Sequence, residues 1–147
     1  MDEIKILTTE LLPWKEIETF QETNFAGSTG FGATASFVGT MRDFNEGDSV
    51  TSMFLEHYPK MTEQQLGQLV SDTKKKWDLL HTLLVHRVGE VKPAQPIVLV
   101  ATWSAHRAAA FDSCRFVMEE LKSKAPFWKK EKLVNGASRW VEKNTIG

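Results

Sequence analysis

The chain has 147 residues, a length that suits one domain with a sizeable core, so we expect a single domain over residues 1–147. Apolar residues make up 41% and charged residues 25%, which predicts an ordered globule rather than a disordered or fibrous chain. The net charge of −1 argues against nucleic-acid binding, which usually needs a basic excess. Any site for an anion must therefore be a local cluster of cations.

The single cysteine, Cys114, excludes an internal disulfide and a zinc site built on several thiolates. It fits a reducing cytoplasm. The N-terminal residues Met1-Asp2-Glu3 do not include the basic stretch that opens a secretion signal, and no run approaches the ~20 apolar residues that span a bilayer. We therefore expect a cytoplasmic protein that is neither secreted nor inserted in a membrane.

The first half of the chain predicts a strand, a helix, two strands and a second helix. Pro13 suits the first position of a helix, and Thr62 with Gln65 resembles a capping box that opens the second helix. The predicted ranges are strand 4–8, helix 13–22, strands 31–41 and 50–58, and helix 62–77. The small and polar residues 43–48 between the two strands suit a mobile loop that could close over a ligand.

The second half predicts two strands, 80–88 and 97–103, and then a helix capped by Ser104. That helix should end near Lys124, because Ala125 precedes a proline. Asn135-Gly136 favours a hairpin that joins strands 131–134 and 137–142. Most consecutive strands are too closely joined for parallel crossovers, so the sequence predicts an α+β fold with three helices and a largely antiparallel sheet.

Two groups of cations are candidate functional residues. His106 and Arg107 lie at the start of the last helix, where free backbone N–H groups and the helix dipole favour an anion, although a solvated first turn is an equally good reading. Lys122 and Lys129 flank the end of the same helix, where exposed lysines are common. If both lysines share a pocket with Arg42, repulsion and burial would lower a lysine's pKa and yield a neutral amine.

The remaining reactive side chains give weaker signals. His57, His81, His86 and His106 lack the spacing of metal ligands, so we predict structural histidines and no metal site. Cys114 lies among apolar residues of the last helix, where a lone cysteine usually packs as a small hydrophobic residue.

Five separate motifs occur in one order along the chain. They are Phe37-Val38-Gly39-Thr40-Met41-Arg42, Leu55-Glu56-His57-Tyr58-Pro59, His86-Arg87-Val88-Gly89-Glu90, Ser104-Ala105-His106-Arg107 and the segment from Lys122 to Lys130. Together they resemble the large, catalytic subunits of molybdopterin synthases, over roughly residues 32–142.

This resemblance implies an α/β-hammerhead type of α+β fold and a sulfurtransferase of molybdenum cofactor biosynthesis. The implied substrate is cyclic pyranopterin monophosphate, which receives two sulfurs to give the dithiolene of molybdopterin. The implied sulfur donor is the thiocarboxylated C-terminal Gly-Gly of a small ubiquitin-like subunit. Two large subunits would form a central homodimer with one small subunit at each end, and we expect no bound cofactor.

Carried onto this chain, the family's catalytic residues fall on Lys122 and Lys129. The implied substrate-binding residues are Thr40, Met41, Arg42, His106, Arg107, Lys130, Glu131 and Arg139.

Helix geometry adds one inference about this site. Sixteen residues of helix place His106 and Lys122 ~24 Å apart, too far for one small substrate to touch both. We therefore predict a composite site, with Arg42, Lys122 and Lys129 from one subunit and His106, Arg107 and Arg139 from its dimer mate.

Two other functions fit the same residues. One is a noncatalytic module that binds a ubiquitin-like tail through its basic cluster. The other is a transferase that uses Cys114 as nucleophile, which requires an exposed thiol with a low pKa.

Overall fold

The computed structural model describes residues 1–124 and 127–141, which form three helices and nine strands. The elements in chain order are β1 (Asp2–Leu7), α1 (Pro13–Asn24), β2 (Ala33–Thr40), β3 (Phe44–Asn45), β4 (Asp48–His57), α2 (Pro59–Lys76), β5 (His81–Arg87), β6 (Gly89–Val91), β7 (Pro96–Ser104), α3 (Arg107–Lys124), β8 (Phe127–Leu133) and β9 (Ser138–Trp140).

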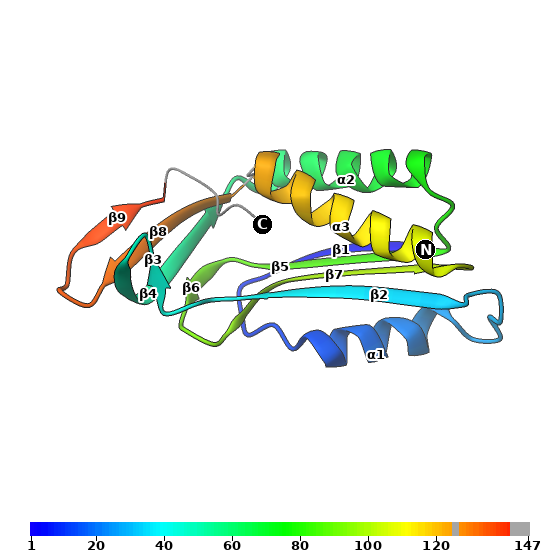
Figure 1. Cartoon of the computed structure of the whole chain (residues 1–147), viewed down its shortest axis with the longest axis horizontal. Helices are drawn as coiled ribbons and strands as arrows, with labels where there is room; N and C mark the ends of the chain where they lie inside the picture. The colour runs from blue at the N-terminus through cyan, green and yellow to red at the C-terminus, as the bar shows by residue number, and fades with distance from the viewer. Residues whose placement is uncertain (125–126, 142–147) are drawn as a thin grey trace.

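The larger part of the molecule is a four-stranded sheet in the order β1-β5-β7-β2. β1 pairs with β5 in parallel, whereas the pairs β5–β7 and β7–β2 are antiparallel. Helices α2 and α3 cover one face of this sheet and α1 covers the other (Figure 1). The central strands β5 and β7 are buried on both faces, which explains why their sequences are nearly continuous apolar runs.

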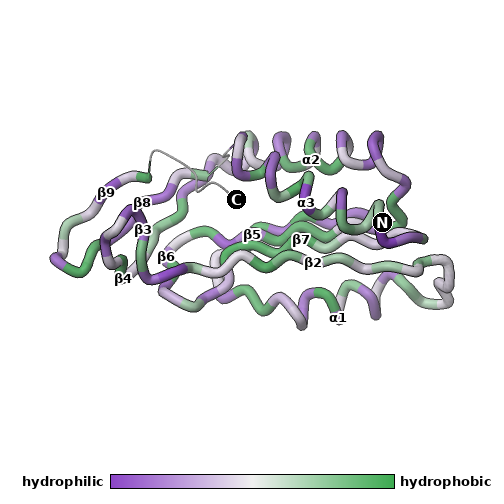
Figure 2. The backbone as a smooth tube through the Cα atoms, viewed as in Figure 1, coloured by the Kyte–Doolittle hydropathy of each residue, from purple (hydrophilic) through white to green (hydrophobic). Residues whose placement is uncertain are grey.

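Two apolar cores lie on the two faces of this sheet. The smaller core packs Phe20 and Phe25 of the α1 unit against Trp103 of β7. The larger core joins α2, α3 and the other sheet face, and it continues into the second sheet through Met53 and Leu55. Figure 2 shows apolar residues along the strands and polar residues on the outer turns of the helices. No helix in the described parts of the chain is long and apolar enough to cross a bilayer.

The second sheet has the order β3-β4-β8-β9, and β6 also pairs with β4. It lies at one end of the molecule, beyond the C-terminal end of α3 (Figure 1). The antiparallel β4–β8 pairing sets Leu55 opposite Lys129. The predicted α+β class, three helices and largely antiparallel pairing are therefore confirmed, and this architecture is compatible with the hammerhead type that the resemblance implies.

Two predicted helix starts are wrong. Helix α2 begins at Pro59, so Thr62 lies inside the helix as a fully buried residue and no side chain caps the N-terminus. Ser104 is the last residue of β7, and its hydroxyl donates to the carbonyl oxygen of His106 rather than accepting from helical N–H groups. Thr62 is thus buried within α2, and the hydroxyl of Ser104 makes a local bond at the end of β7.

The predicted loop over residues 43–48 is instead a tight hairpin of β3 and β4. Glu46 and Gly47 both have positive φ, 51° and 81°, at its turn. The sequence analysis did not predict β6. It predicted that β8 begins at Glu131, whereas the strand begins at Phe127. The predicted helix stop at residues 125–126 and the last strand residue, Glu142, lie outside the described residues.

A cationic candidate active site

A cavity of about 120 Å³ lies at the junction of the two sheets, where α3 ends. We call it the cationic cavity, because Arg42, Lys122 and Lys129 line it and Glu131 is the one acidic residue of its lining. Its other lining residues are Thr40, Met41, Phe44, Asn45, Met53, Ile97 and Val141. Six of the ten residues predicted for the site therefore meet around one space.

The two lysines reach the cavity from different elements. Lys122 lies in the last turn of α3. Lys129 lies on β8, where strand alternation puts it on the same face as Phe127 and Glu131 and turns Lys130 away. The end of a helix and a strand thus bring together the amines of two lysines that are seven residues apart in the sequence.

Burial and charge act together on Lys129. Desolvation lowers the pKa of its amine, the positive charge of Lys122 lowers it further, and the carboxylate of Glu131 partly opposes both effects. A lysine in this setting gives up its proton more easily than an exposed lysine. Its amine can therefore act as a base or proton shuttle nearer to neutral pH.

The end of β2 delivers the remaining cation, Arg42. The pairing with β7 shifts register between Gly39 and Thr40, so the chain leaves the sheet there. The backbone of Met41 is fixed by two hydrogen bonds, from its N–H to Gln95 and from Ala94 to its carbonyl. The guanidinium of Arg42 lies 4.9 Å from the ring centroid of Phe44, a cation–π contact that orients it.

Arg139 braces the wall of the cationic cavity. Its Nε donates to the buried carboxylate of Glu131 at 3.0 Å, and its other nitrogens donate to Asp48 at 2.7 Å and to the carbonyl oxygen of Asn45 at 2.9 Å. The three bonds tie β9 to β8 and to the β3–β4 hairpin of the same chain. The structure thus places Arg139 beside its own subunit's cavity, which differs from the predicted contribution to the mate's site.

Three other predicted residues do not reach this cavity. His106 and Arg107 are exposed at the N-terminal end of α3, the opposite end from Lys122. Lys130 is exposed on the other face of β8, where its Nζ lies 5.6 Å from the ring centroid of Trp140. Within one chain, the phosphate-binding segment predicted at the start of α3 is separate from the lysine pair.

The sequence analysis missed several cavity residues. Phe44 and Asn45 were assigned to a loop, and Met53, Ile97 and Val141 carry no chemical signal of their own. Their role is to shape and desolvate the space around the amines. One local signal was available: Phe44 follows Arg42 by two residues, a spacing that allows a cation–π contact.

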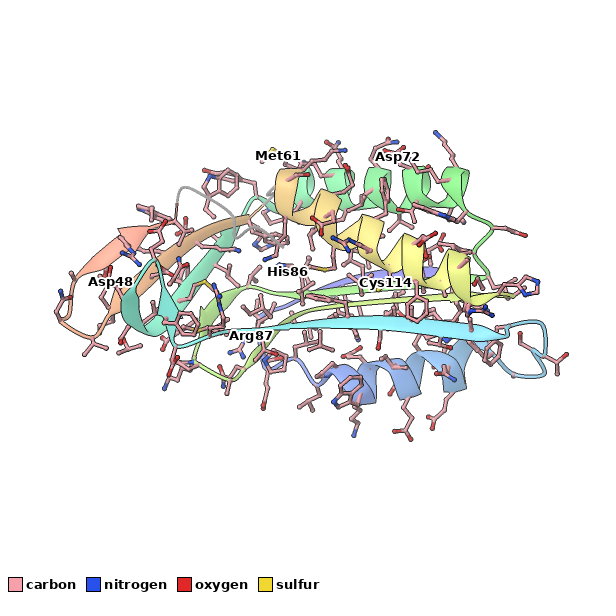
Figure 3. The ribbon with its side chains drawn as sticks, in the orientation of Figure 1. Asp48, Met61, Asp72, His86, Arg87 and Cys114 are labelled. Atoms are coloured by element: carbon pink, nitrogen blue, oxygen red, sulfur yellow. The ribbon has the colours of Figure 1, made fainter. Side chains whose placement is uncertain are left out.

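The prediction that Cys114 packs as a hydrophobic residue is confirmed. Its thiol is buried between α3 and the sheet, and burial raises its pKa to about 11 (Figure 3). An inaccessible thiol with a high pKa lacks both properties that a nucleophilic cysteine needs. Within residues 1–124 and 127–141, no group of three His, Cys, Asp or Glu side chains could hold a metal ion.

The fold and the cationic cavity define a class, an α+β protein that holds two lysines and an arginine around one small cavity. Residues 8–124 match the model of the MoaE protein family. The molybdopterin synthase catalytic subunit of Pseudomonas aeruginosa is 52% identical over 124 residues, which cover 83% of this chain and 82% of that protein.

Solved structures agree with this match. The molybdopterin biosynthesis MoaE protein of Burkholderia ambifaria has a TM-score of 0.80 and 41% identity, with coverage of 100% of this chain and 93% of that one. A complex of subunits 1 and 2 of molybdopterin-converting factor from Helicobacter pylori contains a chain with a TM-score of 0.78, 97% and 92% coverage, and 20% identity, which shows the shared fold. The present chain belongs to the MoaE family, the catalytic subunits of molybdopterin synthase, as its motifs predict.

Proposed function

We propose that this chain converts cyclic pyranopterin monophosphate to molybdopterin, with two sulfurs taken from the thiocarboxylated C-terminal Gly-Gly of a small ubiquitin-like subunit. The observation that carries the proposal is the pairing of Lys129, whose pKa is lowered, with Lys122 in one cationic cavity. We further propose that residues 1–147 act as one domain in the cytoplasm, without a bound cofactor.

Lys122 and Lys129 are the proposed catalytic residues. The tethered tail raises the local concentration of sulfur near the pterin, and the terminal anionic group is drawn to the two amines. As the thiocarboxylate sulfur bonds to a pterin carbon, the bond from that carbon to an oxygen breaks, and the ammonium of one lysine gives the leaving oxygen a proton. The neutral amine then takes a proton from a water molecule that hydrolyses the resulting thioester, so the sulfur stays on the pterin and the carrier leaves as a carboxylate. Each carrier delivers one sulfur, so two carriers react in turn. Sulfur arrives on the partner, so the reaction needs no thiol from this chain.

Arg42 is the proposed phosphate ligand of the chain that supplies the lysines. Its guanidinium is oriented by Phe44 and suits the planar, bidentate recognition of a phosphate. Thr40 and Met41 would contact the substrate at the end of β2, and Glu131 would contact it from β8. Because Glu131 is paired with Arg139, its carboxylate is held in place beside the amines.

Lys130, next to Lys129 on β8, is a further proposed substrate-binding residue of the chain that supplies the lysines. His106 and Arg107 are proposed to act in the site of a second subunit. A two-fold axis that crosses α3 near its middle reverses the helix direction and sets the start of one α3 near the end of the other. The midpoint between His106 and Lys122 is Cys114, and Phe111 beside it is 67% exposed although apolar. Such a homodimer, with one small subunit at each end, would complete the site that one chain leaves open.

A reconstitution assay tests the proposed function. The full chain is mixed with thiocarboxylated carrier and cyclic pyranopterin monophosphate, and dithiolene formation is followed by mass spectrometry. We expect molybdopterin only when the carrier ends in a thiocarboxylate, and none with the same carrier ending in a carboxylate. Absence of product with the thiocarboxylated carrier would refute the proposal.

The binding module is the second candidate, because the same cations would attract a C-terminal carboxylate. Lys122→Ala separates the two functions. For an enzyme, we expect turnover to fall while carrier binding largely persists. For a binding module there is no turnover to lose.

A further inference from the structure

A second cavity, also of about 120 Å³, adjoins the cationic cavity on the α3 side of the sheet. We call it the inner cavity. Both cavities share Thr40, Ile97, Lys122 and Lys129, so the two amines stand between them. Its other lining residues are Phe37, Gly39, His86, Val98, Met118, Leu121 and Phe127.

The inner cavity is narrow where Gly39 and Val98 form its wall. Gly39 keeps its wall close, because a Cβ there would meet the Cγ1 atom of Val98 at 2.7 Å. The space therefore fits a narrow ligand such as a peptide end without side chains.

His86 is the histidine of β5 that lines this cavity, and it lies between the sheet and α3 (Figure 3). Its ring is 5% exposed and stacks on Phe127 with centroids 3.7 Å apart and planes within 10°. Its Nδ1 lies 2.7 Å from the carbonyl oxygen of Arg87. A carbonyl only accepts, so Nδ1 carries the proton and Nε2 of the neutral ring presents a lone pair.

Burial keeps the ring of His86 neutral. Burial lowers its pKa to about 3, the bond to the Arg87 carbonyl opposes this shift, and the charges of Lys129 and His57 add to it. Lys122 of α3 also lines the cavity. The lining thus offers one imidazole acceptor, the hydroxyl of Thr40, and two amines that bind anions.

A C-terminal glycine matches this arrangement of groups. Its backbone N–H is two bonds away from the carbon of its terminal acid, so one donor and one anion lie within a few ångströms of each other. It also has no side chain to clash near Gly39. A neutral acceptor beside two cations is therefore complementary to the end of a glycine tail.

We propose that Nε2 of His86 accepts a hydrogen bond from the backbone N–H of the terminal glycine of the sulfur-carrying partner, and so positions its acid group at Lys122 and Lys129. This inference rests on the proposed function. His86 is then a positioning residue, because it holds the donor tail and takes no proton in the transfer. The stack on Phe127 and the bond to Arg87 fix the ring before the tail arrives, which lowers the entropic cost of binding.

The test combines a change in the chain with a change in one atom of the partner. A carrier ending in a carboxylate is made with its last amide replaced by an ester, which removes only the proposed N–H donor. Calorimetry then compares amide and ester carriers on the unaltered chain and on His86→Phe. On the unaltered chain we expect the ester carrier to bind about tenfold more weakly than the amide carrier, which is the scale of one good hydrogen bond. On His86→Phe we expect the two carriers to bind with nearly equal affinity.

His81→Phe is the matched control. His81 also stacks on a phenylalanine, Phe25, with centroids 4.0 Å apart, but on the other core of the same sheet. This variant should keep the full amide-to-ester difference. An equal difference in His86→Phe would overturn the inference, even if sulfur transfer is confirmed.

Nitrogen NMR of the unaltered chain gives a second readout that needs no stable variant. Adding amide carrier should shift the Nε2 resonance of His86, as expected for a lone pair that becomes a hydrogen-bond acceptor, and the ester carrier should leave it nearly unchanged. An unmoved Nε2 resonance on saturation with amide carrier would refute the contact. A failed reconstitution assay, in contrast, would refute the proposed function itself.

Discussion

The two ends of α3 carry cations in opposite settings. At the N-terminal end His106 and Arg107 face solvent, with no wall of the described chain around them. At the C-terminal end Lys122 meets β8, the end of β2 and the β3–β4 hairpin, which together enclose Lys129 and Arg42. The helix itself is similar at both ends, so the surrounding strands make the difference. A cation gains unusual acid–base properties only where a second element desolvates it.

The largest effect is expected from a comparison of two lysines of β8. Lys129→Ala should lower the rate of sulfur transfer by about a thousandfold, the scale of losing general acid–base catalysis. Lys132→Ala changes the same residue type at an exposed position of the same strand, outside the proposed site, and should keep most of the activity. The rates are compared in the reconstitution assay at saturating carrier. Equal losses would mean that the enclosed position is not what matters.

Mixing two inactive variants tests whether the exposed N-terminal end of α3 acts in the site of the dimer mate. If Arg107 acts in the site of the dimer mate, a mixture of Arg107→Ala and Lys129→Ala chains should recover about a quarter of the activity, because half the dimers then hold one intact site of two. A mixture of Lys122→Ala and Lys129→Ala should recover none, since both lysines belong to one chain's cavity. No recovery in the first mixture would argue that each chain's site is self-contained.

The charge of Glu131 beside Lys129 predicts how the reactivity of Lys129 depends on pH. The carboxylate of Glu131 raises the pKa of Lys129, so Glu131→Gln should lower that pKa. The fraction of neutral amine at a given pH then increases, and acylation of Lys129 should begin at lower pH. Peptide mass spectrometry after pulse acylation measures this midpoint. Glu119→Gln, on the exposed face of α3, should leave it unchanged.

The smallest effect is expected in the middle of α3. Cys114 is buried with a pKa of about 11, so its thiolate fraction near neutral pH is about 100-fold below that of an ordinary cysteine. Alkylation of the folded chain should be correspondingly slow. Cys114→Ser should leave turnover within about twofold. A near-total loss of turnover would restore the cysteine-dependent mechanism as a candidate.

Local sequence patterns were enough to predict the elements with strong periodicity. The apolar runs of β5 and β7, the helical spacing in α2 and the Asn135-Gly136 turn are properties of adjacent residues, and the structure contains all three. Short strands such as β3 and β6 were missed, because two or three residues become a strand only through the partner that accepts their hydrogen bonds. The capping predictions at Thr62 and Ser104 were wrong because α2 begins earlier, at Pro59, and because the pairing of β7 continues through Ser104.

The sequence alone determined the class of fold, the family and the identity of the lysine pair, because motif order and residue type are written along the chain. Only the tertiary structure decided that Lys129 is enclosed while Lys130 is exposed, that Arg139 braces Glu131, and that His86 lines a cavity with its Nδ1 bonded to a backbone carbonyl. Burial, ion pairing and tautomer all depend on atoms contributed by distant segments. No pattern within one segment can specify them.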